Sequence, residues 1–457
     1  MLPGIGKRAA GAIVAMATAA MLACPVSAQT LDESLAQAYL SNPTLLAARA
    51  ELRSVDETIA QALSGYRPTL EASGELAYAR EQSDISSWHT THPNNVALTL
   101  TQPLYTGGRT EASTSQADNL IYAQREFLTA TEQDVMLSVV TVYIDVILAE
   151  AVLELSRNNE DRLQRQLQAT EDRFRVGEVT RTDVSQAKAS LASAVADRLA
   201  AEGALASARA DFESIVGSPA GELTNPGPVT GLPTTSESAL DIAEVEHPTI
   251  RGAQYSELAA IDNVDVEFSD VLPQVSVVGL LSRNYDVSIG LDRQDTAAVL
   301  AQVTVPLYQA GFQSSQIRQA KQLVAQARDQ IDEARRQVLS SVITAWEQLT
   351  TAQAQITAFQ EQVSANEVAL EGTQREAEVG ERTVLDILDA EQALFESQIS
   401  LVTAQRDEVV ASYGLQSAMG RLTAAYLGLP VQLYDVDTYY REARDSWWGW
   451  GGLEADE

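Results

Sequence analysis

The stretch TLTQPLYTGGR at 99–109 has the pattern of a β-strand that ends and a helix that begins, and QVTVPLYQAGF at 302–312 repeats it. In both stretches Pro-Leu-Tyr is followed by two residues and a glycine. A proline limits a strand and a glycine permits a sharp turn, so both stretches are predicted to be strand-to-helix exits. The exit residues are Pro103, Tyr105 and Gly108 in the first stretch and Pro306, Tyr308 and Gly311 in the second.

The same spacing of 203 positions extends through most of the chain. Upstream of the exits the spacing is 205, and a hairpin loop of variable length would absorb the difference. A fixed period without drift indicates an internal duplication. Pairs at these spacings are Pro43 and Pro248, Gly177 and Gly380, Asp183 and Asp386, and Gly217 and Gly420. We therefore expect repeat 1 at 29–216, a Pro/Gly-rich linker at 217–238, repeat 2 at 239–420 and a tail at 421–457.

Each repeat is expected to run helix, β-hairpin, long helix, second helix. Alternation of apolar and polar residues predicts the hairpins, and the long stretch 109–174 lacks proline and glycine. Gly177 and Gly380 are placed to end the long helices as left-handed caps, at turns between long and second helices. The predicted elements are hairpins 66–105 and 271–308, long helices 109–174 and 312–377, and second helices 180–216 and 383–419.

The lengths of these elements predict a rod. A helix of the size of 109–174 is roughly 100 Å long at about 1.5 Å per residue. The helix before each hairpin, 31–64 in repeat 1, and the helix after each glycine turn together have a similar length. We expect the strands at one pole, the glycine turns at the other, and the linker and tail at the waist. Four strands cannot close a barrel, which needs about eight, so several copies would have to contribute.

The first 28 residues have the pattern of an export signal. Lys7 and Arg8 precede the apolar segment 9–22, and Val-Ser-Ala at 26–28 resembles a cleavage site. The sole cysteine, Cys24, is either removed with this peptide or acylated as a lipoprotein residue. Beyond the signal there is no uninterrupted run of 18 apolar residues, so no transmembrane helix is expected.

Composition and motifs exclude several functions. A net charge of −32 and a pI near 4.4 argue against nucleic acid as a partner. There is no Ser-His-Asp order, phosphate loop or metal-spaced cysteine set, so we expect no enzyme, cofactor or metal site. His89 and His92 fall in a predicted hairpin loop without further ligands, and His247 is given no chemical role. The segment SWWGWGG at 446–452 is either an aromatic packing strip or a flexible tail.

The two-repeat layout and several motifs resemble the TolC family of outer-membrane efflux channels. These motifs are LDESLAQAYLSNPTL (31–45), QPLYTGGR (102–109), RFRVGEVTRTDVSQA (173–187) and EVGERTVLDILDAEQAL (378–394). The resemblance implies a mainly α fold with a membrane β-barrel: a homotrimer whose twelve-stranded barrel continues into a long α-helical barrel in the periplasm. It implies a passive exit duct in the outer membrane for tripartite efflux or type I secretion, partnered by a periplasmic adaptor, an inner-membrane pump and outer-membrane lipid.

Asp386 and Asp389 are the first candidate site. They stand three apart at the start of a helix, so they share a face, and threefold symmetry would give a ring of carboxylates. The resemblance makes this ring the narrowest periplasmic constriction. The alternative for Asp386 is a capping box with Thr383, as for Asp183 with Thr180, which leaves Asp389 unexplained.

Arg382 is the second candidate. The resemblance makes it the partner of Thr182 and Asp183 on the other helical hairpin, a link that would hold the closed gate. The alternative is a solvated arginine. Some relatives carry a tyrosine five residues before this arginine, where this chain has Ala377. The competing interpretation of the whole chain is a soluble periplasmic coiled-coil scaffold or adaptor, which would not need detergent for purification.

Overall fold

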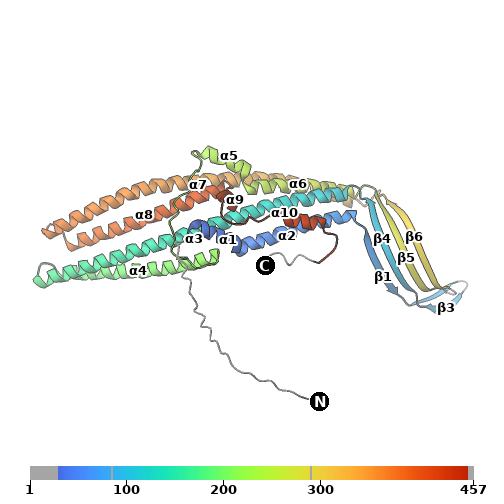
Figure 1. Cartoon of the computed structure of the whole chain (residues 1–457), viewed down its shortest axis with the longest axis horizontal. Coiled ribbons are helices and arrows are strands. Elements are labelled where there is room, and N and C mark those ends of the chain that lie inside the picture. Colours follow the sequence, from blue (N-terminus) through green and yellow to red (C-terminus); the bar gives the residue numbers. More distant parts are fainter. Residues whose placement is uncertain (1–28, 84–85, 289–290, 451–457) are drawn as a thin grey trace, which may run out of the picture.

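The structure is a computed structural model that describes residues 29–83, 86–288 and 291–450. The predicted signal peptide, with Cys24, lies outside the described residues, as do the last two residues of the Trp-rich segment. The molecule is a long rod with its strands at one end and two helical turns at the other (Figure 1). We refer to these ends as the strand pole and the turn pole.

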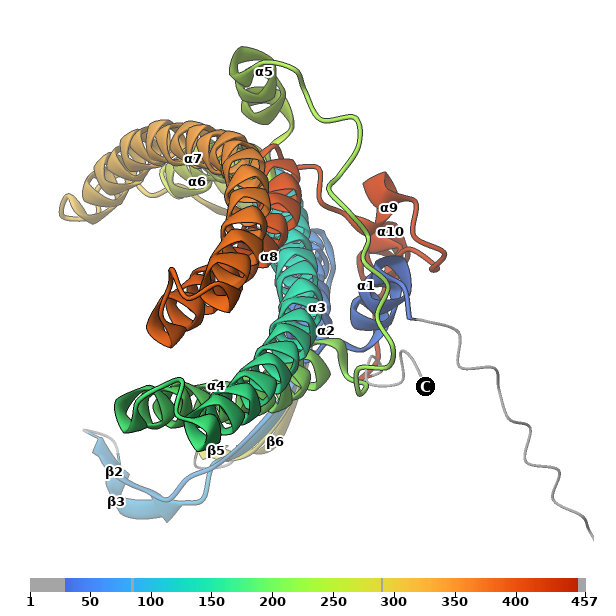
Figure 2. The same cartoon turned by 90° about the vertical axis from the view of Figure 1, so that its left-hand side faces the viewer.

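Two long helices connect the poles. Helix α3 (Arg109–Val176) has 68 residues and α7 (Phe312–Glu378) has 67. Shorter helices lie against them: α2 (Pro43–Leu63) and α4 (Arg181–Val216) against α3, and α6 (Pro248–Ser269) and α8 (Val384–Ala418) against α7. Seen along the rod, the helices form a curved wall with one concave side (Figure 2). Small residues allow this close packing, among them the buried Ala187, Ala194 and Ala201 of α4.

The single helix expected over 31–64 is in fact two helices, α1 (Leu31–Ser41) and α2. Pro43 cannot continue the hydrogen-bond ladder of α1, so it starts a new helix instead. The Asn42 side chain caps α2 by accepting from the N–H groups of Thr44 and Leu45. Repeat 2 has the same break between α5 (Ser236–Glu246) and α6.

His247 occupies the position of Asn42 in repeat 2 and performs the same task. Its Nδ1 accepts a hydrogen bond of 3.2 Å from the N–H of Thr249. Burial lowers the pKa of His247 to about 4, so the ring is neutral and its nitrogen is free to accept at neutral pH. The histidine to which the sequence assigned no role is therefore a helix cap.

The main sheet has four antiparallel strands in the order β1-β4-β5-β6. They are β1 (Thr69–Leu76), β4 (Asn94–Tyr105), β5 (Gln274–Ser288) and β6 (Leu291–Thr304). The pairing of β4 with β5 joins the hairpins of the two repeats. Within the described residues, β1 and β6 each have one neighbour in this sheet, so both of its outer edges are unpaired.

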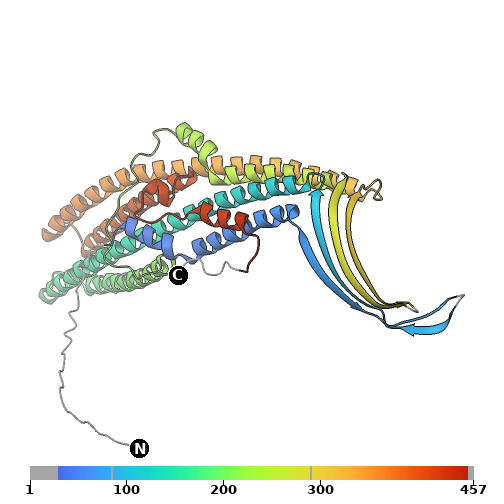
Figure 3. The ribbon, with the colours of Figure 1, turned by 45° about the vertical axis from the view of Figure 1, so that its right-hand side comes forward.

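The hairpin of repeat 1 differs from the prediction. The end of the first predicted strand and the expected loop instead form a second ribbon, β2 (Ala79–Ser83) paired with β3 (Ser86–Thr91), which extends beyond the other strands (Figure 3). The β1–β4 ladder ends at Leu76 and Asn94, beside Pro93, which has no N–H to donate. His89 therefore lies on a strand rather than in a loop.

The largest hydrophobic core lies at the waist, where α1, α2 and the end of α4 surround the middle of α3. By length and composition α3 could cross a membrane, but its apolar residues Met136, Val139 and Val140 are buried in this core. The Tyr143 side chain, also fully buried, fixes the linker: its hydroxyl lies 2.7 Å from the carbonyl of Thr224 and 2.8 Å from that of Gln29.

The C-terminal segment does not stay at the waist as predicted. Helix α9 (Ala424–Leu427) lies beside α1, and α10 (Val436–Asp445) then runs along α2 and α3 toward the strands (Figure 1). The apolar side of α10 packs on Ile59 and Ile121, through Ala443 and two tyrosines.

Candidate gate and membrane strands

The two turns at the turn pole have the same backbone geometry. Gly177 and Gly380 both have φ of +84°, the left-handed conformation that glycine adopts without strain. Each turn is closed by two backbone hydrogen bonds, from Gly177 to Phe174 and Glu178 to Arg173, and from Gly380 to Ala377 and Glu381 to Glu376. This is the Schellman pattern of helix ends. It fixes the direction in which α4 and α8 return.

The start of α8 has two packed faces. Val384 and Leu388 are buried against Leu163 of α3 and Ala187 of α4. Ile387 and Leu394 are buried against α7. At about 100° per residue, Asp386 and Asp389 lie on the opposite side of α8 from Val384 and Leu388. The packing therefore leaves both carboxylates outside the protomer's own helical core.

Asp386 is a helix cap as well as a candidate pore residue. Its Oδ2 accepts hydrogen bonds of 2.8 and 2.7 Å from the N–H and hydroxyl of Thr383, and the same box joins Asp183 to Thr180. The bonds from Thr383 hold the pKa of Asp386 below its usual value, so the group stays ionised. Asp389 is exposed and has no hydrogen-bond or ion-pair partner in the part of the chain described.

Arg382 does not contact Thr182 or Asp183 within the chain. Its Nε donates to Glu376 Oε2 at 2.8 Å, and its Nη1 lies 4.0 Å from Asp386 Oδ1. Both acceptors belong to its own hairpin. Within one protomer Glu376 therefore holds the guanidinium, and the link to Thr182 and Asp183 stays a prediction.

The two turns differ in charge. The turn between α7 and α8 adds Glu378 and Glu381 to the carboxylates of Asp386 and Asp389. The turn between α3 and α4 combines the basic residues Arg173, Arg175 and Arg181 with the acidic Glu178 and Asp183. The turn of repeat 2 is therefore the more acidic of the two.

Glu391 was missed by the sequence analysis. It is 4% exposed, its Oε2 has no hydrogen bond among the described atoms, and burial raises the pKa of its carboxyl, an effect that Arg162 and Arg165 oppose. Glu391 follows Asp386 by five residues, so at about 100° per residue it lies on a different side of α8, which could have suggested that it faces α3. The Glu391 carboxyl is therefore a titratable group between the two hairpins, close to the candidate gate.

The strand exits are built differently in the two repeats. Tyr105 still pairs with Val275, after a bulge at Pro103, whereas β6 ends at Thr304, before Pro306 and Tyr308. Gly108 and Gly311 are the N-caps of α3 and α7, with φ of +85° and +81°. Both exits therefore use a left-handed glycine to turn the chain from strand to helix.

The sheet has one apolar face. Cross-strand partners share a face, so the pairs Leu70–Leu100, Leu98–Leu281 and Leu281–Ala297 place their side chains together. Leu70, Leu281 and Val299 are exposed in the protomer. The opposite face is polar along β1 and β4, with Glu71, Ser73, Glu75, Thr99 and Thr101. Along β5 and β6 it is mixed, with Thr296 and Gln302 beside Leu280 and Leu300.

Among the described residues no group of three His, Cys, Asp or Glu side chains could hold a metal ion. His92 lies beside β5, where its backbone N–H donates to the Asp286 carboxylate at 2.5 Å.

The chain is similar to known outer-membrane proteins. The family model described as "Outer membrane efflux protein" matches residues 34–218 and 239–421. The outer membrane efflux protein BepC of Brucella suis is 35% identical over 423 residues, 92% of each chain. Outer membrane protein TolC of Escherichia coli is 26% identical, over 86% of this chain and 83% of its own. The crystal structure of outer membrane protein VceC of Vibrio cholerae has a similar fold, with a TM-score of 0.72 and 20% identity over 85% of this chain and 96% of that one.

Proposed function

The chain belongs to the TolC family of outer membrane efflux proteins, and from that membership we propose that three copies form one continuous duct, gated at its periplasmic end. The protein is an outer-membrane channel for efflux, and its family consists of passive conduits rather than enzymes. The arrangement of the copies, the gate residues and the partners are our proposal.

The unpaired edges of the sheet support assembly. A sheet edge cannot be left open in lipid, because no water satisfies its N–H and C=O groups. The four strands alternate in direction, so β6 of one copy can pair antiparallel with β1 of the next. Two copies would give a barrel of about eight strands, whose interior is filled by side chains. Three copies give twelve strands and leave a lumen, lined by the more polar face of the sheet.

The helical wall continues the duct. Its curvature in one protomer is that of a segment of a tube (Figure 2). In a threefold tube, Asp386 and Asp389 of each copy would form a ring of carboxylates at the turn pole. Such rings favour cations and bind multivalent ones, which block the pore. Arg382 would hold this end closed, either through Glu376 as in the protomer or by exchange onto Thr182 and Asp183 of an adjacent hairpin.

We propose a periplasmic adaptor protein and an inner-membrane pump as partners at the turn pole. The name of BepC, an efflux protein, favours small-molecule export, and type I secretion of proteins is the second candidate. A passive duct takes its cargo from the pump. We therefore assign the transport class to this chain and the substrate choice to its partners.

Disulfide trapping between β1 and β6 tests whether the unpaired edges of neighbouring copies meet in the assembly. The only natural cysteine is Cys24, so engineered cysteines report without interference in the signal-cleaved chain. Ala72→Cys on β1 should form disulfide-linked dimers and trimers when combined with one of a series of cysteines on β6, from Ala297→Cys to Ala301→Cys. Val277→Cys on the interior strand β5, combined with Ala72→Cys, is the matched control and should give no disulfide-linked dimers or trimers.

Cross-linked dimers without cross-linked trimers would contradict the trimer. Absence of any intermolecular product with the whole β6 series would contradict barrel closure by these edges. A protein that fractionates with the soluble periplasm without detergent would support the scaffold instead.

A further inference from the structure

The Trp-rich segment lies next to the start of the membrane strands. Arg67, two residues before β1, donates from Nη1 to the carbonyl of Ser446 at 2.7 Å. Its guanidinium also stacks over the ring of Trp447, 4.7 Å from the ring centre. These two contacts hold Ser446 and Trp447 beside the start of β1.

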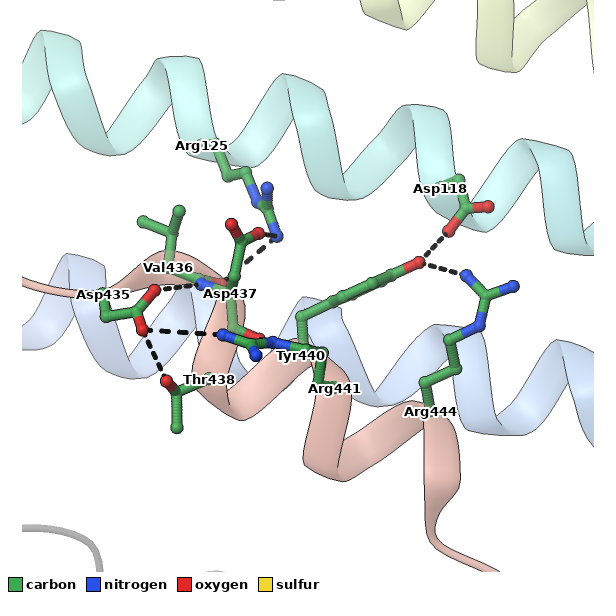
Figure 4. Close-up of polar contacts among 9 residues, drawn as sticks. All are labelled: Asp118, Arg125, Asp435, Val436, Asp437, Thr438, Tyr440, Arg441 and Arg444. Atoms are coloured by element: carbon green, nitrogen blue, oxygen red, sulfur yellow. Dashed lines mark hydrogen bonds and ion pairs between the residues drawn. The ribbon is translucent and has the colours of Figure 1, made fainter.

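Helix α10 holds this segment in place through polar contacts along its length (Figure 4). Asp437 forms an ion pair of 2.8 Å with Arg125 of α3. The Tyr440 hydroxyl donates to Asp118 of α3 at 2.7 Å, and the Tyr439 hydroxyl donates to Glu57 of α2 at 2.8 Å. Each contact joins α10 to the protomer's own wall. The helix thus carries the chain from the waist to the strand pole.

The three tryptophans at the end of this helix are exposed. Trp447, Trp448 and Trp450 are 71%, 93% and 100% exposed, although they are among the largest apolar side chains in the chain. A polar chain end would need no such residues. Three neighbouring exposed tryptophans indicate a surface that another phase or molecule covers.

The position of the tryptophans along the rod indicates that lipid covers them. Other exposed aromatic residues lie at the same end of the sheet: Tyr66 before β1, Tyr105 at the end of β4 and Tyr308 after β6. Aromatic residues form girdles at both interfaces of membrane barrels, where the ring sits at the level of the lipid headgroups. Each interface is only about 5 to 7 Å thick, so a segment fixed beside Arg67 lies at its level.

We propose that residues 446–450 form an interfacial anchor, which inserts Trp447, Trp448 and Trp450 into the headgroup region of the periplasmic leaflet. The occupant of this surface is phospholipid, not a second copy of the chain or another protein. The segment adds an aromatic contribution from the C-terminus to the girdle that the strand ends supply. The proposal requires that the sheet spans the outer membrane, and the test below separates the two.

Depth-dependent fluorescence quenching tests the anchor. The chain has five tryptophans, and the other two are Trp88 and Trp346. Three variants of the full signal-cleaved chain are placed in phospholipid nanodiscs with bromine either near the headgroups or near the bilayer centre. The tail variant keeps Trp447, Trp448 and Trp450 and carries Trp88→Phe and Trp346→Phe. A second variant keeps Trp346 alone, in α7 at the waist. A third has Leu98→Trp on the apolar sheet face as its only tryptophan.

The tail variant should lose more fluorescence to bromine near the headgroups than to bromine near the bilayer centre. Trp346 should lose none, and Leu98→Trp should be quenched by the deeper bromine. Quenching of Leu98→Trp without quenching of the tail would overturn the anchor and leave the channel intact. If the tail is also shielded from aqueous acrylamide, another protein surface covers it. If no variant is quenched, both the membrane-spanning sheet and the anchor are contradicted.

Discussion

Arg382 and Glu376 form an ion pair across the α7–α8 turn, with 2.8 Å between Nε and Oε2. They are six residues apart, and Gly380 lies between them. The same guanidinium is 4.0 Å from Asp386, so one cation faces two carboxylates at the turn. An exposed pair of this kind contributes little to stability. Its importance depends on what it holds in the assembled duct.

Replacing Arg382 should weaken the closed gate. We expect Arg382→Ser to raise the resting conductance in planar bilayers, because the carboxylates of the turn lose their cation and repel one another. Arg375→Ser is the matched control, since Arg375 pairs with Glu371 within α7. Equal conductance of the two variants and the parent would exclude Arg382 from the gate.

Neutralising Asp386 and Asp389 should relieve block by multivalent cations. The double change to asparagine removes the charge, while asparagine at 386 can still accept a hydrogen bond in the capping box. Block is measured as the cation concentration that halves the single-channel current, and we expect this concentration to rise at least about tenfold if the ring is worth about 1.4 kcal/mol. Asp211→Asn, at an exposed position of α4 far from the turn pole, is the control and should leave block unchanged. The constriction lies elsewhere if the double variant is blocked like the parent.

Asp56 should make the stability of the protein depend on pH. This carboxyl of α2 is 1% exposed and neither oxygen has a hydrogen bond among the described atoms. Burial raises its pKa to about 6, opposed by Arg125 and Arg53 and assisted by Glu57 and Asp437. The folded state therefore holds a proton that the unfolded state releases near the ordinary aspartate pKa of 3.8. Stability should fall as pH rises from that value through about 6.

Asp56→Asn should abolish this dependence and raise stability above pH 6 by on the order of 1 to 3 kcal/mol. Thermal unfolding of the detergent-purified protein on either side of that pH provides the measurement. Glu51→Gln, at an exposed position of the same helix, is the control. If Asp56→Asn retains the parent's pH profile, some other group causes it.

The two glycines before α3 should respond unequally to alanine. Both have positive φ, which costs an alanine about 1 to 2 kcal/mol. A Cβ at Gly108 meets nothing within 4 Å, whereas one at Gly107 would lie 2.7 Å from the carbonyl oxygen of Ser269. We therefore expect Gly107→Ala to lower the melting temperature more than Gly108→Ala. Equal losses would mean that α6 moves away from the exit without cost. Repeat 2 has Ala310 with φ of +51° at the equivalent position.

The sequence predicted the rod because its signals are local and occur twice. Glycines at 177 and 380 permit left-handed turns, and the alternation along 94–105 favours a strand, so both signals can be recognised from nearby residues alone. The proline at 43 was just as local, but the helical pattern on both sides of it concealed the break between α1 and α2. The cap at His247 could have been recognised from the Asn42 that precedes the equivalent proline.

What sequence could not predict depends on contacts between distant segments. Arg382 had several carboxylates within reach, and only the fold of the turn brings Glu376 nearest. The path of α10 is set by Tyr439 and Tyr440, whose partners Glu57 and Asp118 lie more than 300 positions earlier. Glu391 of α8 is likewise buried near Arg162 and Arg165 of α3, which belong to the other hairpin. No periodicity within one helix specifies such pairs.

The unpaired edges of β1 and β6 also impose an order on biogenesis. A newly exported chain that inserted its strands alone would place two rows of unsatisfied peptide groups in hydrocarbon. Helices α3 and α7, which carry most of the rod, can form in water without that penalty. For the proposed trimer, this penalty is avoided if three chains assemble before their strands enter the bilayer, or if another strand-bearing protein covers each edge until the neighbouring copy pairs with it.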